Sequence, residues 1–160
     1  MTLRPVSCAR LGPWETAVLN LLGREVMDQG HAHALAPSVM VNVAAQFMAS
    51  ENIGAIMVVE EGKLVGIFTE RDALYRVIAR GCDPHTTPLS EVMTPQPFTI
   101  APNKSYGHAL VLMQENGFRH VPVMEDGKPI GIVSARNAMD PELEEFASEA
   151  QRRKFLREQA

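Results

Sequence analysis

The sequence has little cysteine and no long apolar segment. Cys8 and Cys82 stand alone, without the C-x-x-C spacing of a redox motif or a zinc site. Disulfides are rare in the reducing cytoplasm, so we expect two free thiols. No apolar run approaches the ~20 residues that span a bilayer, and the first residues lack the apolar segment of a signal peptide. These absences predict a cytoplasmic protein that does not insert into a membrane.

The sequence also lacks an excess of charge of one sign and the patterns of catalytic sites. Fifteen basic and 19 acidic residues give a net charge of −4, and the two signs are interspersed, which argues against nucleic acid as the main partner. No Ser-His-Asp, Cys-His or Walker pattern occurs. His31 and His33 alternate without a third metal ligand nearby, so we interpret them as a loop. We expect no catalytic residues, no metal site and no required cofactor.

What the sequence does contain is one segment that occurs twice. Residues 58–73 align without a gap with residues 123–138, 65 positions later, and the match extends back to Ala36-Pro37 against Ala101-Pro102. A fixed period indicates one structural unit built twice. One copy of about 60 residues is marginal alone, whereas the chain is 46% hydrophobic. The two copies are therefore expected to pack together.

Each copy has the same predicted elements. Two apolar runs flank a glycine turn, Glu61-Gly62 in one copy and Asp126-Gly127 in the other, which is typical of a β-hairpin. Apolar residues at helical spacing precede each hairpin, and a hydroxyl residue follows it as a helix start. We predict strands over 34–35 and 98–100, hairpins over 55–68 and 120–133, and helices over 39–51, 70–80, 103–116 and from about 135.

The remaining segments lie outside the repeat. Pro13 opens a predicted helix over 13–28, expected to pack under the first copy. The last helix carries an apolar stripe of Leu143, Phe146 and Ala150, which must be buried on the same chain or on a second subunit. We divide the chain into an N-terminal segment and helix (1–23), repeat one (24–81), linker and repeat two (82–140), and a C-terminal amphipathic helix (141–160).

The repeated motif resembles a known family. The segment Gly66-Ile67-Phe68-Thr69-Glu70-Arg71-Asp72 resembles the Gly-h-h-(Thr/Ser)-x-x-Asp motif of the cystathionine-β-synthase (CBS) domain, where h is apolar. The segment Gly131-Ile132-Val133-Ser134-Ala135-Arg136-Asn137 resembles its second copy. Met93-Thr94-Pro95 and the run from Phe118 to Val123 also fit. The resemblance, to a tandem CBS pair or Bateman module, covers about residues 24–140.

The resemblance implies an α/β (α+β) fold of two pseudo-twofold lobes, each a small three-stranded mixed sheet with flanking helices, together with the N- and C-terminal helices. It implies two clefts between the lobes that commonly bind AMP, ADP or ATP, and sometimes NAD- or S-adenosylmethionine-type ligands. It also implies a homodimer with a regulatory, non-enzymatic role toward a protein partner, whose identity is unknown.

The first cleft is expected around Thr69 and Asp72. An ionised Asp accepts hydrogen bonds on two oxygens, which suits the two hydroxyls of a ribose. Apolar strand residues, Ile67 here and Ile132 in the other copy, are expected to sandwich a purine. In the implied fold the strand of the opposite copy adds Thr99. The alternative is that Thr69 and Asp72 only cap their helix.

The second cleft is expected around Ser134 and Asn137, where the neutral amide weakens a ribose contact. The implied fold adds Ala34 and Leu35 from the opposite strand. Arg119 and His120 stand where the first copy has Gly54 and Ala55. They are expected on the phosphate side of this second cleft, where Arg119 suits a bidentate phosphate contact. Gly54 is also counted among the candidate ligand-binding residues.

Two functions stay open at this point. The first is a regulatory module that senses an adenine nucleotide. The second is a ligand-free dimerisation or scaffold module that acts on proteins through its amphipathic tail. An enzyme is the least favoured interpretation, because the histidines have no carboxylate or thiol partner at a telling spacing.

Overall fold

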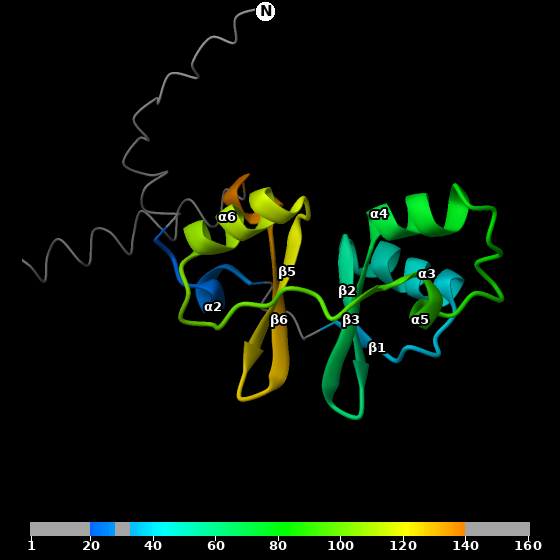
Figure 1. Cartoon of the computed structure of the whole chain (residues 1–160), viewed down its shortest axis with the longest axis horizontal. Helices are drawn as coiled ribbons and strands as arrows, with labels where there is room; N and C mark the ends of the chain where they lie inside the picture. Colours follow the sequence, from blue (N-terminus) through cyan, green and yellow to red (C-terminus); the bar gives the residue numbers. More distant parts are fainter. Residues whose placement is uncertain (1–19, 28–32, 140–160) are drawn as a thin grey trace, which may run out of the picture.

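The computed structural model describes residues 20–27 and 33–139, which form two lobes side by side (Figure 1). Lobe one is built mainly from repeat one and lobe two from repeat two. The predicted α+β class with pseudo-twofold lobes is confirmed. The predicted helix from residue 141 and most of the one over 13–28 lie outside the described residues.

The sheet of lobe one has four strands in the order β1-β2-β3-β4. Strand β1 (Ala34–Leu35) is parallel to β2 (Ala55–Glu60), and β3 (Lys63–Thr69) is antiparallel to both β2 and β4 (Thr94–Pro95). Lobe two has the antiparallel pair β5 (His120–Glu125) and β6 (Lys128–Ser134). The resemblance implied three strands in each sheet; the described residues form four and two.

Both hairpins turn as their glycines predicted. Glu61 and Gly62 have φ of 49° and 77°, and Asp126 and Gly127 have φ of 49° and 76°. Two consecutive left-handed residues make the tight turn whose twist matches a hairpin. Both hairpins also shift register at equivalent points, between Val58 and Val59 and between Val123 and Met124. The two copies thus share even their irregularities.

The longer helices lie close to their predicted ranges. Helix α3 spans Val41–Glu51 and α6 spans Tyr106–Asn116, where Ser105 caps α6 by accepting from the His108 backbone N–H. The prediction of a single α-helix over 70–80 is wrong. A three-residue α4 (Glu70–Asp72) runs into a π-helix, η1 (Ala73–Ile78). Its counterpart in repeat two, η2 (Ala135–Met139), is a 3₁₀ helix.

The segment ahead of each repeat packs on the opposite lobe. Helix α5 (Leu89–Val92) buries Leu89 and Val92 in lobe one, and Thr94–Pro95 completes its sheet. Helix α2 (Gly23–Val26) packs in lobe two with α6, so the expectation that it lies under the first copy is wrong. The predicted strand over 98–100 is also wrong, because only Ile100 pairs there, through one bridge to Val123.

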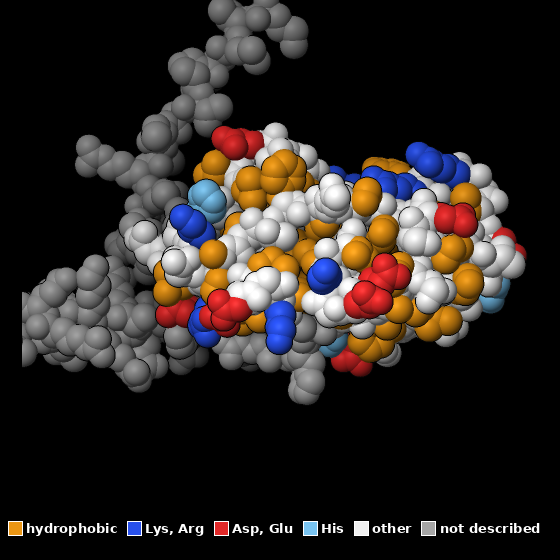
Figure 2. Space-filling view, turned by 60° about the horizontal axis from the view of Figure 1, so that its bottom comes forward, with side chains coloured by type: hydrophobic (Ala, Val, Ile, Leu, Met, Phe, Trp, Pro, Cys, Tyr) orange, Lys and Arg blue, Asp and Glu red, His pale blue; other side chains and the backbone are white. Residues whose placement is uncertain are grey.

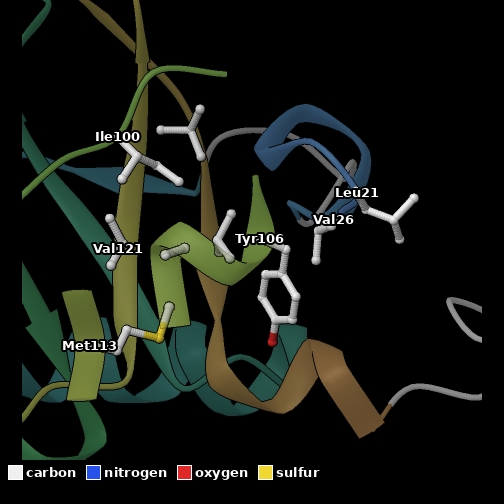
Figure 3. Packing of buried hydrophobic residues seen from close by; sticks show 9 residues of the cluster. Leu21, Val26, Ile100, Tyr106, Met113 and Val121 are labelled. Carbon is white, nitrogen blue, oxygen red and sulfur yellow. The ribbon is translucent and has the colours of Figure 1, made fainter. Parts of the chain in front are cut away.

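Each lobe has its own apolar core, and a third cluster joins them. Figure 3 shows the core of lobe two, in which Tyr106 of α6 lies on the side of Val26, and Met113 of α6 lies on the side of Val121. The shared cluster contains Ala55, Met57, Ile67 and Ile132. Because β2 and β3 pack on β6 through this cluster, the ends of the two hairpins come together. This contact positions the pocket described below.

The surface agrees with the expected mixture of charge. On the face drawn in Figure 2, acidic and basic side chains are interspersed over the described part of the chain. Within residues 20–27 and 33–139, no helix is long and apolar enough to cross a bilayer.

Candidate functional site

A pocket of about 490 Å³ lies between the lobes; we call it the Asp72 pocket. Lobe one contributes the end of β3 and the start of the following helix, from Ile67 to Arg76, together with Thr94 and Pro95 of β4. The connecting segment adds residues 96–98, and lobe two adds residues 116–120. A ligand in this pocket would contact both repeats, so its affinity would depend on the position of one lobe relative to the other.

Asp72 is held firmly at one wall of this pocket. Its Oδ2 accepts from the Thr69 backbone N–H at 2.9 Å and from the Thr69 hydroxyl at 2.8 Å, and the Thr69 Oγ1 accepts from the Asp72 N–H at 3.2 Å. This is a reciprocal helix cap. Only 8% of Asp72 is exposed. The capping role considered from the sequence is therefore real.

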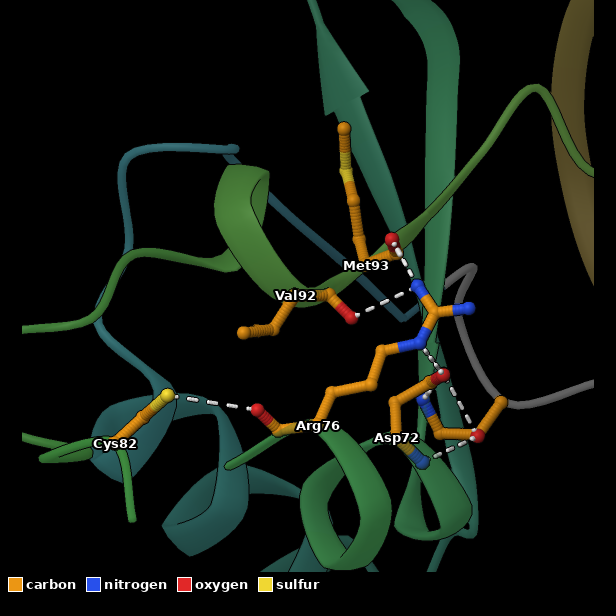
Figure 4. A network of polar contacts seen from close by, with 6 residues as sticks. Asp72, Arg76, Cys82, Val92 and Met93 are labelled. Atoms are coloured by element: carbon orange, nitrogen blue, oxygen red, sulfur yellow. Dashed lines mark hydrogen bonds and ion pairs between the residues drawn. The ribbon is translucent and has the colours of Figure 1, made fainter. Parts of the chain in front are cut away.

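Arg76 holds the other oxygen of the same carboxylate (Figure 4). Its Nε lies 3.2 Å from Asp72 Oδ1, and its Nη1 donates to the carbonyls of Met93 at 2.7 Å and Val92 at 3.4 Å. A carboxylate offers about four lone-pair sites, and these contacts take three. One acceptor site of Asp72 is left over, and Asp72 lines the pocket, so capping and ligand contact are compatible.

Two further contacts shape the pocket mouth. Arg71 of lobe one donates from Nη1 to the carbonyl of Gly117 in lobe two at 2.8 Å. Phe98 and Phe118 stack with ring centroids 5.6 Å apart and 23° between their planes, and Phe98 is 55% exposed. An exposed aromatic face beside polar groups suits a flat ring system such as a purine.

The charges of the pocket favour an anion. Three arginines and two carboxylates line it: Arg71, Arg76, Arg119, Glu70 and Asp72. The charges of Asp72 and Arg76 cancel, because the two side chains form an ion pair. Two positive charges then face one negative charge, in a chain whose net charge is −4.

The structure brings together five of the residues singled out from the sequence: Ile67, Thr69, Asp72, Arg119 and His120. The assignment of Arg119 and His120 to the cleft of Asn137 is wrong. The hairpins pack so that the start of β5 meets the start of β2, and a Cβ on Gly54 would lie 3.3 Å from His120 Nε2. Residues 119–120 therefore reach the cap of the opposite repeat.

Two other expectations also change. Thr99 is exposed and is not among the residues that line the Asp72 pocket; Phe98 takes that place, because residues 98–99 are not a strand. Gly54 lines a separate depression of about 340 Å³ beside α3, together with Arg136 and Glu70.

The equivalent residues of repeat two form a weaker cap. Asn137 Oδ1 accepts from the Ser134 N–H at 2.7 Å, and position 141, which corresponds to Arg76, is proline. Ile132 lies in the cluster between the lobes, and Leu35 packs against the core of lobe one. Residues 94–97 line the Asp72 pocket, and the equivalent positions in the repeat, 29–32, lie outside the described residues.

Most of the other pocket residues were not predicted from the sequence, and four of them matter most for the chemistry of the site: Arg71, Arg76, Phe98 and Phe118. Arg71 lies within the motif of residues 66–72 and Arg76 lies four residues after it, so the motif itself was a usable signal. Phe98 and Phe118 come from segments without a regular pattern, and only the packing of the lobes brings their rings together.

Comparison with known proteins agrees with this geometry. The family model of the CBS domain matches residues 24–79 and again residues 89–141. The chain belongs to the CBS domain family. Because CBS domains are generally regulatory modules, the tandem pair indicates a regulatory or sensing role for this chain.

Known CBS proteins resemble it over most of its length. YhcV of Bacillus subtilis is 38% identical over 62% of this chain and 71% of its own. The mitochondrial protein CBSX3 of Arabidopsis thaliana is 35% identical over 68% of this chain, and the match spans 55% of that protein's length. A structure described as a signal-transduction protein with CBS domains, from Burkholderia ambifaria, aligns with a TM-score of 0.65 at 31% identity, over 69% of this chain and 81% of that one.

Within the part of this CBS chain that the structure describes, no group of three or more His, Cys, Asp or Glu side chains is arranged to hold a metal ion. The features of the Asp72 pocket are a capped carboxylate, guanidinium groups and stacked aromatic rings. They are binding groups, and they suit an anionic ligand with an aromatic ring.

Proposed function

We propose that this CBS chain is a regulatory module that binds an adenine nucleotide in the Asp72 pocket and transmits its occupancy to a protein partner. One observation carries the proposal: a single pocket, lined by both repeats, combines a fixed carboxylate, arginines and an exposed aromatic ring. These groups match the ribose, phosphate and base of a nucleotide respectively. Ligands of the NAD or S-adenosylmethionine type carry the same adenosine and are tested as well. The cytoplasmic location stays a prediction.

The test compares the wild-type chain with Asp72→Asn by calorimetry against AMP, ADP, ATP, NAD and S-adenosylmethionine. Asparagine keeps one acceptor for the Thr69 N–H, as Asn137 does in repeat two, but removes the charge. Losing a charge-assisted ribose contact costs roughly 1.5–3 kcal/mol, which is about a ten- to hundredfold rise in Kd. We also expect a nucleotide to raise the Tm of the wild type, because it binds only the folded chain.

Asn137→Ala is the matched control, because it removes the equivalent cap without touching the Asp72 pocket. Its affinity at that pocket should equal that of the wild type. Equal affinity in wild type and Asp72→Asn would remove Asp72 from the site. No heat and no change in Tm with any adenine ligand would favour the ligand-free scaffold.

We also propose that the chain forms a homodimer. Three apolar side chains of η1 are well exposed: Leu74 at 51%, Tyr75 at 59% and Ile78 at 70%. Neighbouring exposed apolar groups often mark a contact between proteins. Light scattering at micromolar concentration should give a dimer, and Ile78→Asp should shift the population toward monomer. A strict monomer in the wild type would contradict this.

A further inference from the structure

We propose that the Asp72 pocket selects nucleoside di- and triphosphates over the monophosphate, and that Arg71 and Arg119 bind the additional phosphates. This inference rests on the proposed function, since it takes for granted that the pocket binds a nucleotide. It goes further by naming the class of nucleotide and the two residues that distinguish it.

The first argument is the charge that remains after pairing. Arg76 is neutralised by Asp72. Among the described residues, neither Arg71 nor Arg119 forms a salt bridge, although both line the pocket. The carboxylate of Glu70 also lines the pocket, but it offsets only one of these two positive charges, so the cavity keeps a net positive charge. An anion that carries several charges offsets this positive charge better than one that carries fewer.

The second argument is the position of Arg71. Its Nη1 bond to the Gly117 carbonyl uses one of five N–H donors and fixes the guanidinium across the interface between the lobes. Gly117 is two residues before Arg119 in the chain. The tether therefore directs Arg71 toward the segment that carries Arg119. The four other donors of Arg71 are left for a ligand, and a guanidinium binds phosphate through two of them.

The third argument is that the two arginines come from different lobes. A ribose on Asp72 places the first phosphate at one fixed point, and a longer phosphate chain reaches further across the pocket. A chain of two or three phosphates carries more oxygens and spans more of the pocket than a single phosphate, so it is better suited to bind guanidinium groups from both lobes at once. Each extra charge-assisted contact is worth about a ten- to hundredfold gain in affinity.

Repeat one and repeat two differ at these positions in a way that supplies a control. Arg136 corresponds to Arg71, but it lines the separate depression beside α3 rather than the Asp72 pocket. Arg136→Ala therefore removes the same charge from an equivalent site without changing the pocket.

The experiment is calorimetry on the full chain with AMP, ADP and ATP in the presence of EDTA, so that no divalent cation screens the phosphates. We expect ADP and ATP to bind the wild type at least about tenfold tighter than AMP. Arg71→Ala and Arg119→Ala should each weaken ATP binding about tenfold or more and leave AMP binding nearly unchanged. Arg136→Ala should behave like the wild type with all three ligands.

Different failures lead to different conclusions. If no adenine nucleotide binds, the proposed function itself fails. If AMP and ATP bind with equal affinity, only the selectivity is overturned. If Arg71→Ala weakens AMP and ATP equally, Arg71 is only a structural link between the lobes. If inorganic triphosphate binds as tightly as ATP, the pocket is a simple anion site, and the inference is overturned in that way too.

Discussion

The two repeats share one backbone plan but hold their motifs by different means. Both hairpins have the same left-handed turn and the same register shift. In repeat one, Asp72 is fixed by Thr69 and by Arg76. In repeat two, Asn137 is fixed through the Ser134 N–H. A neutral amide is thus sufficient for the fold at this position. The charge and the arginine of repeat one are additions that the fold does not require, which is why we connect them with ligand binding.

A second difference lies beneath the motif. Tyr106 in α6 takes the place that Val41 has in α3, and its hydroxyl donates to the carbonyls of Ser134 at 2.9 Å and Ala135 at 3.2 Å. The ring is fully buried. Repeat two therefore holds the end of β6 from inside the core, where repeat one holds its motif from the pocket side through Arg76.

The largest expected effect follows from this difference. Tyr106→Ala should lower the free energy of unfolding by about 3–5 kcal/mol, because it leaves a large cavity in lobe two. Tyr106→Phe should lower it by about 1 kcal/mol, the value of one hydrogen bond. Val41→Ala, the matched change in lobe one, removes two carbons and should lower it by about 1.5–2 kcal/mol. Urea unfolding measures all three; equal losses for Tyr106→Ala and Val41→Ala would refute the comparison.

The sequence was sufficient to predict what depends on neighbours in the chain. The hairpins, their turns and the helices before them follow from apolar runs, Glu61-Gly62 and Asp126-Gly127, and helical spacing. The cap at Thr69 and Asp72 is also local, since its groups are three residues apart. The repeat strengthens these predictions, because the sequence pattern of each copy predicts the same element independently.

The features that were missed depend on how the lobes meet. The exchange of α2 and Thr94–Pro95 between lobes, and the placement of Arg119 in the Asp72 pocket, come from packing between distant residues. The π-helix η1 keeps helical spacing over only six residues, so a periodicity of 3.6 does not distinguish it from an α-helix. The sequence pattern within one repeat does not predict these contacts between the lobes.

The second-largest expected effect is a difference in stability between variants that lack the cap of repeat one and variants that lack the cap of repeat two. Asp72→Ala removes two hydrogen bonds to a charged acceptor and the bond to Arg76, and should lower stability by about 2 kcal/mol. Asn137→Ala removes one neutral bond and should lower it by about 1 kcal/mol. Thermal unfolding without ligand measures both. A loss for Asn137→Ala as large as that for Asp72→Ala would show that the charge adds nothing to the cap.

The smallest effect concerns the ends of the equivalent helices α3 and α6. Both end in a left-handed residue, Asn52 with φ of 53° in one and Gly117 with φ of 74° in the other. Asparagine tolerates this conformation at some cost, whereas glycine has no Cβ to strain. Asn52→Gly should therefore change stability by no more than a few tenths of a kcal/mol, since the relief of strain is offset by the greater freedom of unfolded glycine.

The substitution at the equivalent position of the other repeat, Gly117→Ala, should change the stability more than Asn52→Gly does. A Cβ added at Gly117 meets no atom within 4 Å, so Gly117→Ala imposes only the backbone strain of a left-handed alanine, about 1 kcal/mol. Urea unfolding measures this loss, and the Arg71 bond to the Gly117 carbonyl makes the substitution informative about the pocket as well. If strain displaces that carbonyl, Gly117→Ala should weaken ATP binding in the same direction as Arg71→Ala. A loss of stability with unchanged ATP affinity would mean that Arg71 reaches its ligand without this tether.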